Sequence, residues 1–253
     1  MSAGEQPKTR DVAAAFLVAG ALILFQVSFT RLISYKLFYH FVFFAISLSL
    51  LGLGAAGTYV AVRKRRGDLD RTLLGWLALL VPSVPIAFLL IANPFGVTHH
   101  PPVRTKLLGG DAIVYLLWCS PLMVWLNFCG GVVLTSLFSR YSERMGRLYA
   151  ADLVGAAAGS LACVALMKYG SPPAAFVAGV LPLTIALVAY ARSQSVGPGD
   201  RVLAGVAATA GLLLAVGVFA GPSIYRDFQN FRTEGGKLRE VIKYEWNHII
   251  RTD

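Results

Sequence analysis

The chain has 253 residues, of which 56% are hydrophobic and 14% are charged, and its formal net charge is +10. Soluble domains carry about 25% charged residues, so this composition excludes a soluble globular protein. The positive charge does not indicate nucleic-acid binding, because no soluble basic domain accompanies it and cations beside membrane-spanning helices face anionic lipid instead. We therefore expect an integral membrane protein whose first partner is the lipid bilayer.

Long apolar stretches separated by short polar breaks predict an all-α fold, a polytopic bundle of about seven transmembrane helices. A stretch of roughly 20 apolar residues crosses the ~30 Å hydrocarbon core of a bilayer as a helix. The first stretch follows a polar N-terminus and lacks a small-residue cleavage site, so it is expected to be a retained helix rather than a signal peptide. The predicted spans are residues 12–33, 38–62, 72–92, 112–138, 150–169, 172–191 and 202–225.

The distribution of Lys and Arg predicts which side of the membrane each connection faces. A basic loop follows the second span and contains Arg63, Lys64, Arg65 and Arg66. If the N-terminus is cytoplasmic, twelve Lys and Arg lie in the inside segments and five in the outside loops before the tail. The positive-inside rule thus favours a multi-pass protein of the cell membrane with a cytoplasmic N-terminus. Seven spans then place the C-terminal tail outside.

Two glycine patterns predict close helix packing. Gly52, Gly54 and Gly57 match a dinucleotide-binding pattern letter for letter, but they lie inside an apolar span and not in a turn between a strand and a helix. Gly155 and Gly159 form a GxxxG pattern. Small residues of this kind let a neighbouring helix approach closely, and that helix could belong to the same chain or to another subunit.

Four polar residues in or near the predicted spans are candidates for an intramembrane site: Gln26, Arg31, Asn127 and Asp152. A carboxylate in the membrane is costly unless it faces a partner or a cavity, which makes Asp152 the most informative of the four. We expect Asp152 to pair with Arg147 or with Arg31. The alternatives are that Asp152 caps a helix, that Arg31 extends to the interface, and that Asn127 bonds to a neighbouring backbone.

No residue pattern in the chain indicates catalysis, a cofactor or a metal centre. We find no nucleophile and base, paired carboxylates or phosphate loop in a suitable context. His99 and His100 are adjacent in a Pro-rich loop, where they do not favour binding the same ion. Cys119, Cys129 and Cys163 lie inside apolar stretches and are predicted to be small buried side chains rather than a disulfide or metal framework.

Residues 25–32 (FQVSFTRL) and above all residues 146–156 (GRLYAADLVGA) resemble the membrane region of spermidine synthase-like membrane proteins. Residues 244–253 (YEWNHIIRTD) resemble the strand that opens the synthase-like part of that family. The resemblance implies a helix bundle, residues 1–225, and a polar tail, residues 226–253, that begins a soluble aminopropyltransferase-like domain. The site residues of such a domain would lie beyond the tail, so none is carried over and the question of an enzyme stays open.

The resemblance implies the membrane module of a spermidine synthase-like protein, which anchors that protein and could pass a small cationic or amino-acid-like solute. The alternative is a purely structural anchor or scaffold subunit with no translocation path. Either module could form a homo-oligomer or join a soluble synthase-like domain. Two features depart from the family: Gln26 stands where a Glu is common, and the synthase-like domain is not among these 253 residues. An external tail would also hold a synthase away from cytosolic substrates. Convergence of the four polar residues on a cavity would favour solute passage over an anchor.

Overall fold

The described part of the chain is helical almost throughout and contains no strand. Its apolar helices provide seven segments that are long and apolar enough to cross a membrane, so the prediction of an all-α polytopic bundle is confirmed. The computed structural model describes residues 6–36, 42–63, 68–92, 110–169 and 172–220. The helices are α1 (Thr9–Lys36), α2 (Val42–Val62), α3 (Leu69–Ala92), α4 (Gly110–Arg140), the 3-10 helix η3 (Ser142–Arg144), α5 (Gly146–Tyr169), α6 (Pro172–Ala178), α7 (Val180–Ala191) and α8 (Pro198–Ala220).

The helices α1, α3 and α8 each begin three or four residues before the predicted spans, which started at residues 12, 72 and 202. Their extra first turns carry the acidic residues Asp11, Asp70 and Asp200, respectively. A carboxylate in the first turn is stabilised by the free backbone N–H groups and by the helix dipole. The charged residues therefore belong to the helices rather than to the loops. The predicted tail, residues 226–253, lies outside the described residues.

The predicted span 172–191 consists of two helices, α6 and α7, which are separated at Gly179. Pro182 explains the break, because it has no N–H and its ring collides with the carbonyl group four residues earlier in a regular helix. That carbonyl group belongs to Ala178, the last residue of α6. A Cβ atom at Gly179 would overlap the ring of Phe25 on α1, so the glycine lets α1 approach the break closely.

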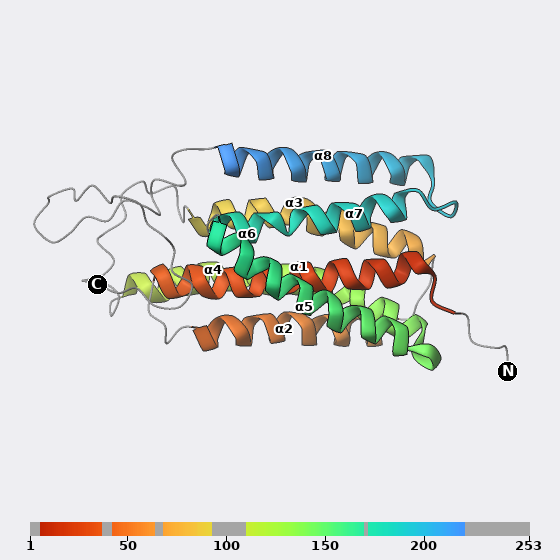
Figure 1. Cartoon of the computed structure of the whole chain (residues 1–253), viewed down its shortest axis with the longest axis horizontal. Coiled ribbons are helices and arrows are strands. Elements are labelled where there is room, and N and C mark those ends of the chain that lie inside the picture. The colour runs from red at the N-terminus through yellow and green to blue at the C-terminus, as the bar shows by residue number, and fades with distance from the viewer. Residues whose placement is uncertain (1–5, 37–41, 64–67, 93–109, 170–171, 221–253) are drawn as a thin grey trace, which may run out of the picture.

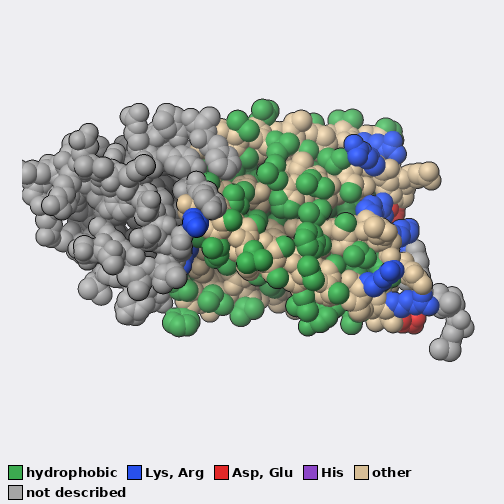
Figure 2. Space-filling model, in the orientation of Figure 1, with side chains coloured by type: hydrophobic (Ala, Val, Ile, Leu, Met, Phe, Trp, Pro, Cys, Tyr) green, Lys and Arg blue, Asp and Glu red, His purple; other side chains and the backbone are tan. Residues whose placement is uncertain are grey.

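The helix α1 lies near the centre of the bundle and contacts α2, α4, α5, α6 and α7 (Figure 1). The largest fully buried side chains include Phe25, Phe29, Phe88, Phe176 and Tyr190. The helices α2, α5 and α8 are peripheral, because only 28%, 22% and 33% of the residues in their most apolar windows are buried. Their exposed apolar side chains form the surface that a lipid bilayer would cover (Figure 2).

The described charges gather at one end of the bundle, where α1, α3, α5 and α8 begin (Figures 1 and 2). Nine of the Lys and Arg residues whose side chains are described lie at this end. Among the described side chains, Arg31 and Lys168 are the only Lys or Arg toward the opposite end. We call the first the cation-rich end. The two ends of the apolar bundle thus differ strongly in charge.

Candidate functional site

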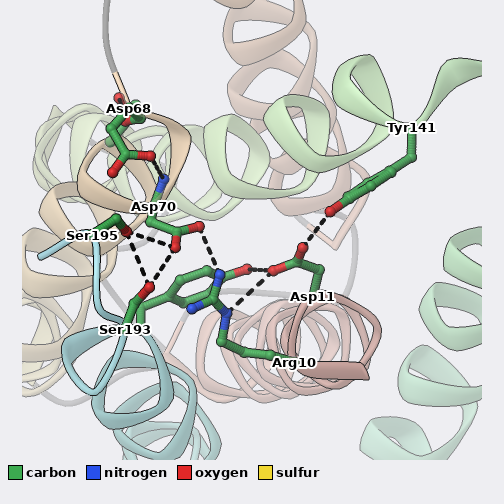
Figure 3. Close-up of polar contacts among 9 residues, drawn as sticks. Arg10, Asp11, Asp68, Asp70, Tyr141, Ser193 and Ser195 are labelled. Carbon is green, nitrogen blue, oxygen red and sulfur yellow. Dashed lines mark hydrogen bonds and ion pairs between the residues drawn. The ribbon is translucent and has the colours of Figure 1, made fainter. Parts of the chain in front are cut away.

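The cation-rich end holds a group of polar side chains that joins five segments of the chain (Figure 3). The segments are the first turns of α1 and α3, the residue after α4, the end of α7 and the connection from α7 to α8. Each side chain bonds to another member of the group. We call this group the Asp11–Asp70 network, and its members are Arg10, Asp11, Asp70, Tyr141, Tyr190, Ser193 and Ser195.

Arg10 links the two carboxylates of the network. Its Nη2 donates to Oδ1 of Asp70 at 2.7 Å, and its Nε lies 3.5 Å from Oδ1 of Asp11. The central carbon of the guanidinium lies 4.5 Å from the centre of the Tyr190 ring. One cation therefore serves two carboxylates and one aromatic face, which stabilises its charge at a half-buried position.

Asp11 is the most deeply buried charge of the network, with only 2% of its surface exposed. The hydroxyl group of Tyr141 donates to its Oδ2 at 2.6 Å, and the hydroxyl group of Tyr190 donates to its Oδ1 at 2.7 Å. A buried carboxylate is tolerated when it is paired and hydrogen-bonded. The two tyrosines and Arg10 supply the interactions that water would otherwise supply.

Asp70 ties the connection between α7 and α8 to the first turn of α3. Its Oδ2 accepts hydrogen bonds from the hydroxyl groups of Ser193 at 2.6 Å and of Ser195 at 2.9 Å. The two hydroxyl oxygens lie 3.0 Å apart. On the other side of the connection, Nη2 of Arg201 donates to the carbonyl oxygen of Ser193 at 3.1 Å. The start of α8 is therefore held to the end of α7.

A second ion pair joins α3 to α8, between Nε of Arg71 and Oδ2 of Asp200 at 3.1 Å. Its arginine side chain is 70% exposed, so this pair contributes little by itself. The network offers no obvious chemistry, since Ser193 and Ser195 face a carboxylate and the described residues contain no histidine to act as a base. Its arrangement suits a clamp that fixes the helix ends relative to one another.

The four predicted polar residues do not come together in the described structure. Asn127 is buried between α4 and α2, where its side-chain nitrogen donates to the Met123 carbonyl oxygen at 2.9 Å and lies 3.4 Å from the Ser49 hydroxyl. Gln26 is half-buried on α1, and Arg31 is exposed near the end of α1 that lies away from the cation-rich end. The prediction that they meet Asp152 in one site is therefore wrong.

Asp152 is half-buried on α5, close to the cation-rich end. The helices α1 and α5 run in the same direction, and Gly155 packs against the backbone of Phe16. Arg31 then lies about 27 Å farther along the axis than Asp152, because each helical residue advances 1.5 Å. No ion pair or hydrogen bond joins the carboxylate to Arg147 or to any other described residue. The expected pairing of Asp152 is thus also wrong.

The GxxxG pattern lies against α1 of the same chain. A Cβ atom at Gly155 would overlap the backbone of Phe16, and one at Gly159 would lie 2.8 Å from Cα of Gly20. The backbone of α1 therefore occupies the space that a side chain at either position would need. These two glycines set how closely α1 and α5 approach.

The three glycines of α2 behave differently from one another. A Cβ atom at Gly52 would lie 2.6 Å from the carbonyl oxygen of Val124 on α4. At Gly54 and Gly57 it would meet no described atom within 4 Å. No described helix of the chain therefore packs closely at Gly54 and Gly57, and packing of these two glycines against another subunit stays a prediction.

Arg63, the first residue of the predicted basic loop, bonds through Nη1 to the hydroxyl group of Tyr59, and its guanidinium lies 5.5 Å from the centre of that ring. The other three cations of the loop, residues 64–66, lie outside the described residues, as do both histidines of the Pro-rich loop. All three cysteines are buried and free of disulfides, as predicted.

Sequence reasoning missed the Asp11–Asp70 network because it treated these charges as loop residues. A signal was present: Arg10 and Asp11 are neighbours in the sequence, Asp70 is followed by Arg71, and Asp200 is followed by an arginine. Each acid–base neighbour pair lies in the first turn of a helix that begins at the same end. Their convergence follows from the topology of an up-and-down bundle.

No protein-family model matches the chain, and no curated protein or solved structure matches it either. The resemblance to spermidine synthase-like membrane proteins therefore stays a prediction. The seven apolar segments make the chain a multi-pass membrane protein.

Proposed function

We propose that this chain is a membrane anchor, a rigid helical module that holds an attached or associated soluble partner at the bilayer. The Asp11–Asp70 network carries the proposal, because it bonds the ends of α1, α3, α4 and α7 to one another at the membrane surface. Buried polar groups that are fully bonded hold the elements around them in one arrangement. A partner mounted on such an end would be held in a fixed orientation.

The separation of the predicted polar residues also supports an anchor over a solute path. Asn127 uses its amide to join α4 to α2, and Arg31 lies far along the axis from Asp152. If the resemblance to spermidine synthase-like membrane proteins holds, a soluble synthase-like domain would follow α8, which ends away from the cation-rich end. The network would then fix that domain through the rigid bundle, and a partner at the cation-rich end would be a separate protein. We further propose that the module resides in the cell membrane with the cation-rich end in the cytoplasm, because cations accumulate in cytoplasmic segments.

One observation favours a second function, the passage of a small cationic solute such as a polyamine. Asp152 is a half-buried carboxylate that no described cation or hydrogen-bond donor contacts. An intramembrane carboxylate without a partner is by default a candidate site for an ion or proton. Under this alternative, Asp152 would bind the solute cation directly.

Uptake of labelled spermidine and putrescine by vesicles that contain the purified chain distinguishes the two functions. If the chain is an anchor, uptake equals that of protein-free vesicles, and a soluble reporter fused after the last residue stays with the membrane during alkaline carbonate extraction. Uptake that exceeds the protein-free level and is lost in Asp152→Asn would contradict the anchor and establish the alternative. Release of the reporter by carbonate would also count against the anchor.

A further inference from the structure

We propose that a groove between the first turns of α1 and α5 binds one anionic phospholipid, whose phosphate group is held by Arg144 and Arg147. The groove consists of two adjoining hollows at the cation-rich end, of about 440 Å³ and about 630 Å³, which share Pro7 and Arg147 in their walls. The proposal concerns one site on the surface of the bundle and does not depend on the function of the whole chain.

We call the smaller hollow, which lies at the tip of the cation-rich end, the upper hollow and the larger one the lower hollow. The upper hollow is polar and positively charged. Its walls are formed by Gln6, Pro7, Arg144, Gly146 and Arg147. A Cβ atom at Gly146 would meet no described atom within 4 Å, so the space beside this residue is open. A headgroup can therefore reach the two guanidinium groups without moving the backbone.

The lower hollow is apolar and follows α1 and α5 toward the membrane interior. Apart from Pro7, Thr9 and Arg147, it is lined by Val12, Ala13, Phe16, Ala150, Ala151 and Val154. It ends near the point where the two helices meet at Gly155 and the backbone of Phe16. From residue 147 to residue 154 the helix rises about 10 Å, which suits the upper part of an acyl chain.

Arg144 and Arg147 differ from three other arginines at this end and, among the described residues, share the lack of a bonded side-chain partner with Arg192, which lies outside the groove. Arg10, Arg71 and Arg201 each bond to a carboxylate or a carbonyl oxygen. No side-chain hydrogen bond or ion pair joins Arg144 or Arg147 to any described residue, although Glu143 lies next to Arg144 in the sequence. Two exposed guanidinium groups that no described residue neutralises are complementary to a phosphate diester, which guanidinium binds with paired hydrogen bonds.

The combination of the two hollows selects a lipid over a soluble anion. A free phosphate ion would contact only the upper hollow and would leave the apolar walls of the lower one uncovered. A phospholipid covers both, with its phosphate at the arginines and its acyl chain along Val12, Phe16 and Val154. Basic pockets between membrane helices on the cytoplasmic side bind anionic headgroups in this manner. Because the two arginines carry charge, phosphatidylglycerol is favoured over zwitterionic phosphatidylcholine.

The test uses the purified, delipidated full chain in detergent, titrated with dioleoyl phosphatidylglycerol or dioleoyl phosphatidylcholine while bound lipid is counted by native mass spectrometry. We expect phosphatidylglycerol to bind roughly tenfold more tightly than phosphatidylcholine. The double variant Arg144→Gln/Arg147→Gln should lose this preference. The matched control Arg192→Gln, an exposed arginine at the same end but outside the groove, should keep it.

A second variant tests the apolar half without touching the charges. Ala150→Trp should fill the lower hollow and weaken the binding of both lipids, whereas Val216→Trp, at an exposed position on α8, should not. Inorganic phosphate at millimolar concentration should neither displace the lipid nor raise the unfolding temperature. The proposal is overturned if the arginine double variant keeps the full preference, if Ala150→Trp binds both lipids normally, or if phosphate alone displaces the lipid.

Discussion

Asp11 is the residue on which the polar network depends most, because its carboxylate is buried and bonds to residues from two distant parts of the chain and to the neighbouring Arg10. Its neighbours Tyr141 and Tyr190 lie 130 and 179 residues away in the sequence. A hydrogen bond to a charged group stabilises a protein by about 1.5–3 kcal/mol, and removing the donor leaves the charge poorly solvated. The two tyrosine hydroxyl groups thus contribute more to the stability of the protein than the small surface area of a hydroxyl group would indicate.

Tyr190→Phe should therefore lower the free energy of unfolding by roughly 1.5–3 kcal/mol. The substitution keeps the aromatic ring over Arg10 and removes only the hydroxyl donor to Asp11. The measurement is thermal or denaturant unfolding in detergent. Ser195→Ala is the control, because this serine is exposed and Asp70 keeps two other donors, and it should cost less than about 1 kcal/mol. An equal decrease in the free energy of unfolding for the two variants would show that the buried hydrogen bond stabilises the protein no more than the exposed one.

Replacing an aspartate by asparagine should have opposite effects on stability at Asp11 and at Asp152. A carboxylate at membrane depth costs a few kcal/mol on insertion scales, and no described group offsets this cost for Asp152. Asp152→Asn should therefore leave the unfolding temperature unchanged or raise it, while Asp11→Asn should lower it. A clear loss of stability in Asp152→Asn would indicate that the carboxylate has a partner in the folded protein.

At the scale of elements, the contact between α1 and α5 rests on two residues without side chains. Gly155 and Gly159 bring the α5 backbone against the backbone of α1, and in this contact a carbonyl group cannot yield as a flexible side chain can. The outward glycines of α2 have no such neighbour among the described residues. The same residue type thus has two different roles in one bundle.

Gly155→Ala should separate α1 from α5 and lower the unfolding temperature, and Gly155→Leu and Gly159→Leu should do so more strongly. Gly54→Ala is the matched control, since its Cβ atom enters open space and alanine favours the helix by up to about 1 kcal/mol over glycine. The control should be neutral or slightly stabilised. If Gly155→Ala keeps the wild-type unfolding temperature, the close contact does not contribute to stability.

The number and type of the membrane spans could be predicted from the sequence, because apolar length alone decides whether a helix crosses a bilayer. The helix starts could not, since the charges of Asp11, Asp70 and Asp200 were assigned to loops although they complete first turns. The Asp11–Asp70 network could not be predicted for the same reason. Its ion pair between Arg10 and Asp70 joins residues 60 positions apart, and only the packed bundle shows that they meet.

At the scale of the whole molecule, the two ends of the bundle differ in the charge and the bonding of their described residues. The cation-rich end carries the polar network, the lipid groove and most of the described Lys and Arg (Figure 2). Anionic lipid and the positive-inside rule both favour placing such an end in the cytoplasm. Since seven segments cross the membrane, the chain that follows α8 would then emerge on the opposite side.

Cysteine labelling in intact cells tests this orientation. Glu143→Cys in η3 and Gly67→Cys in the basic loop should resist a membrane-impermeant maleimide until the cells are permeabilised, whereas Lys168→Cys at the other end of α5 should react at once. The native cysteines are all buried, so the unsubstituted chain provides a low background. Reaction of Glu143→Cys without permeabilisation, together with protection of Lys168→Cys, would reverse the orientation of the whole bundle. It would also place the arginine-rich groove against the outer leaflet.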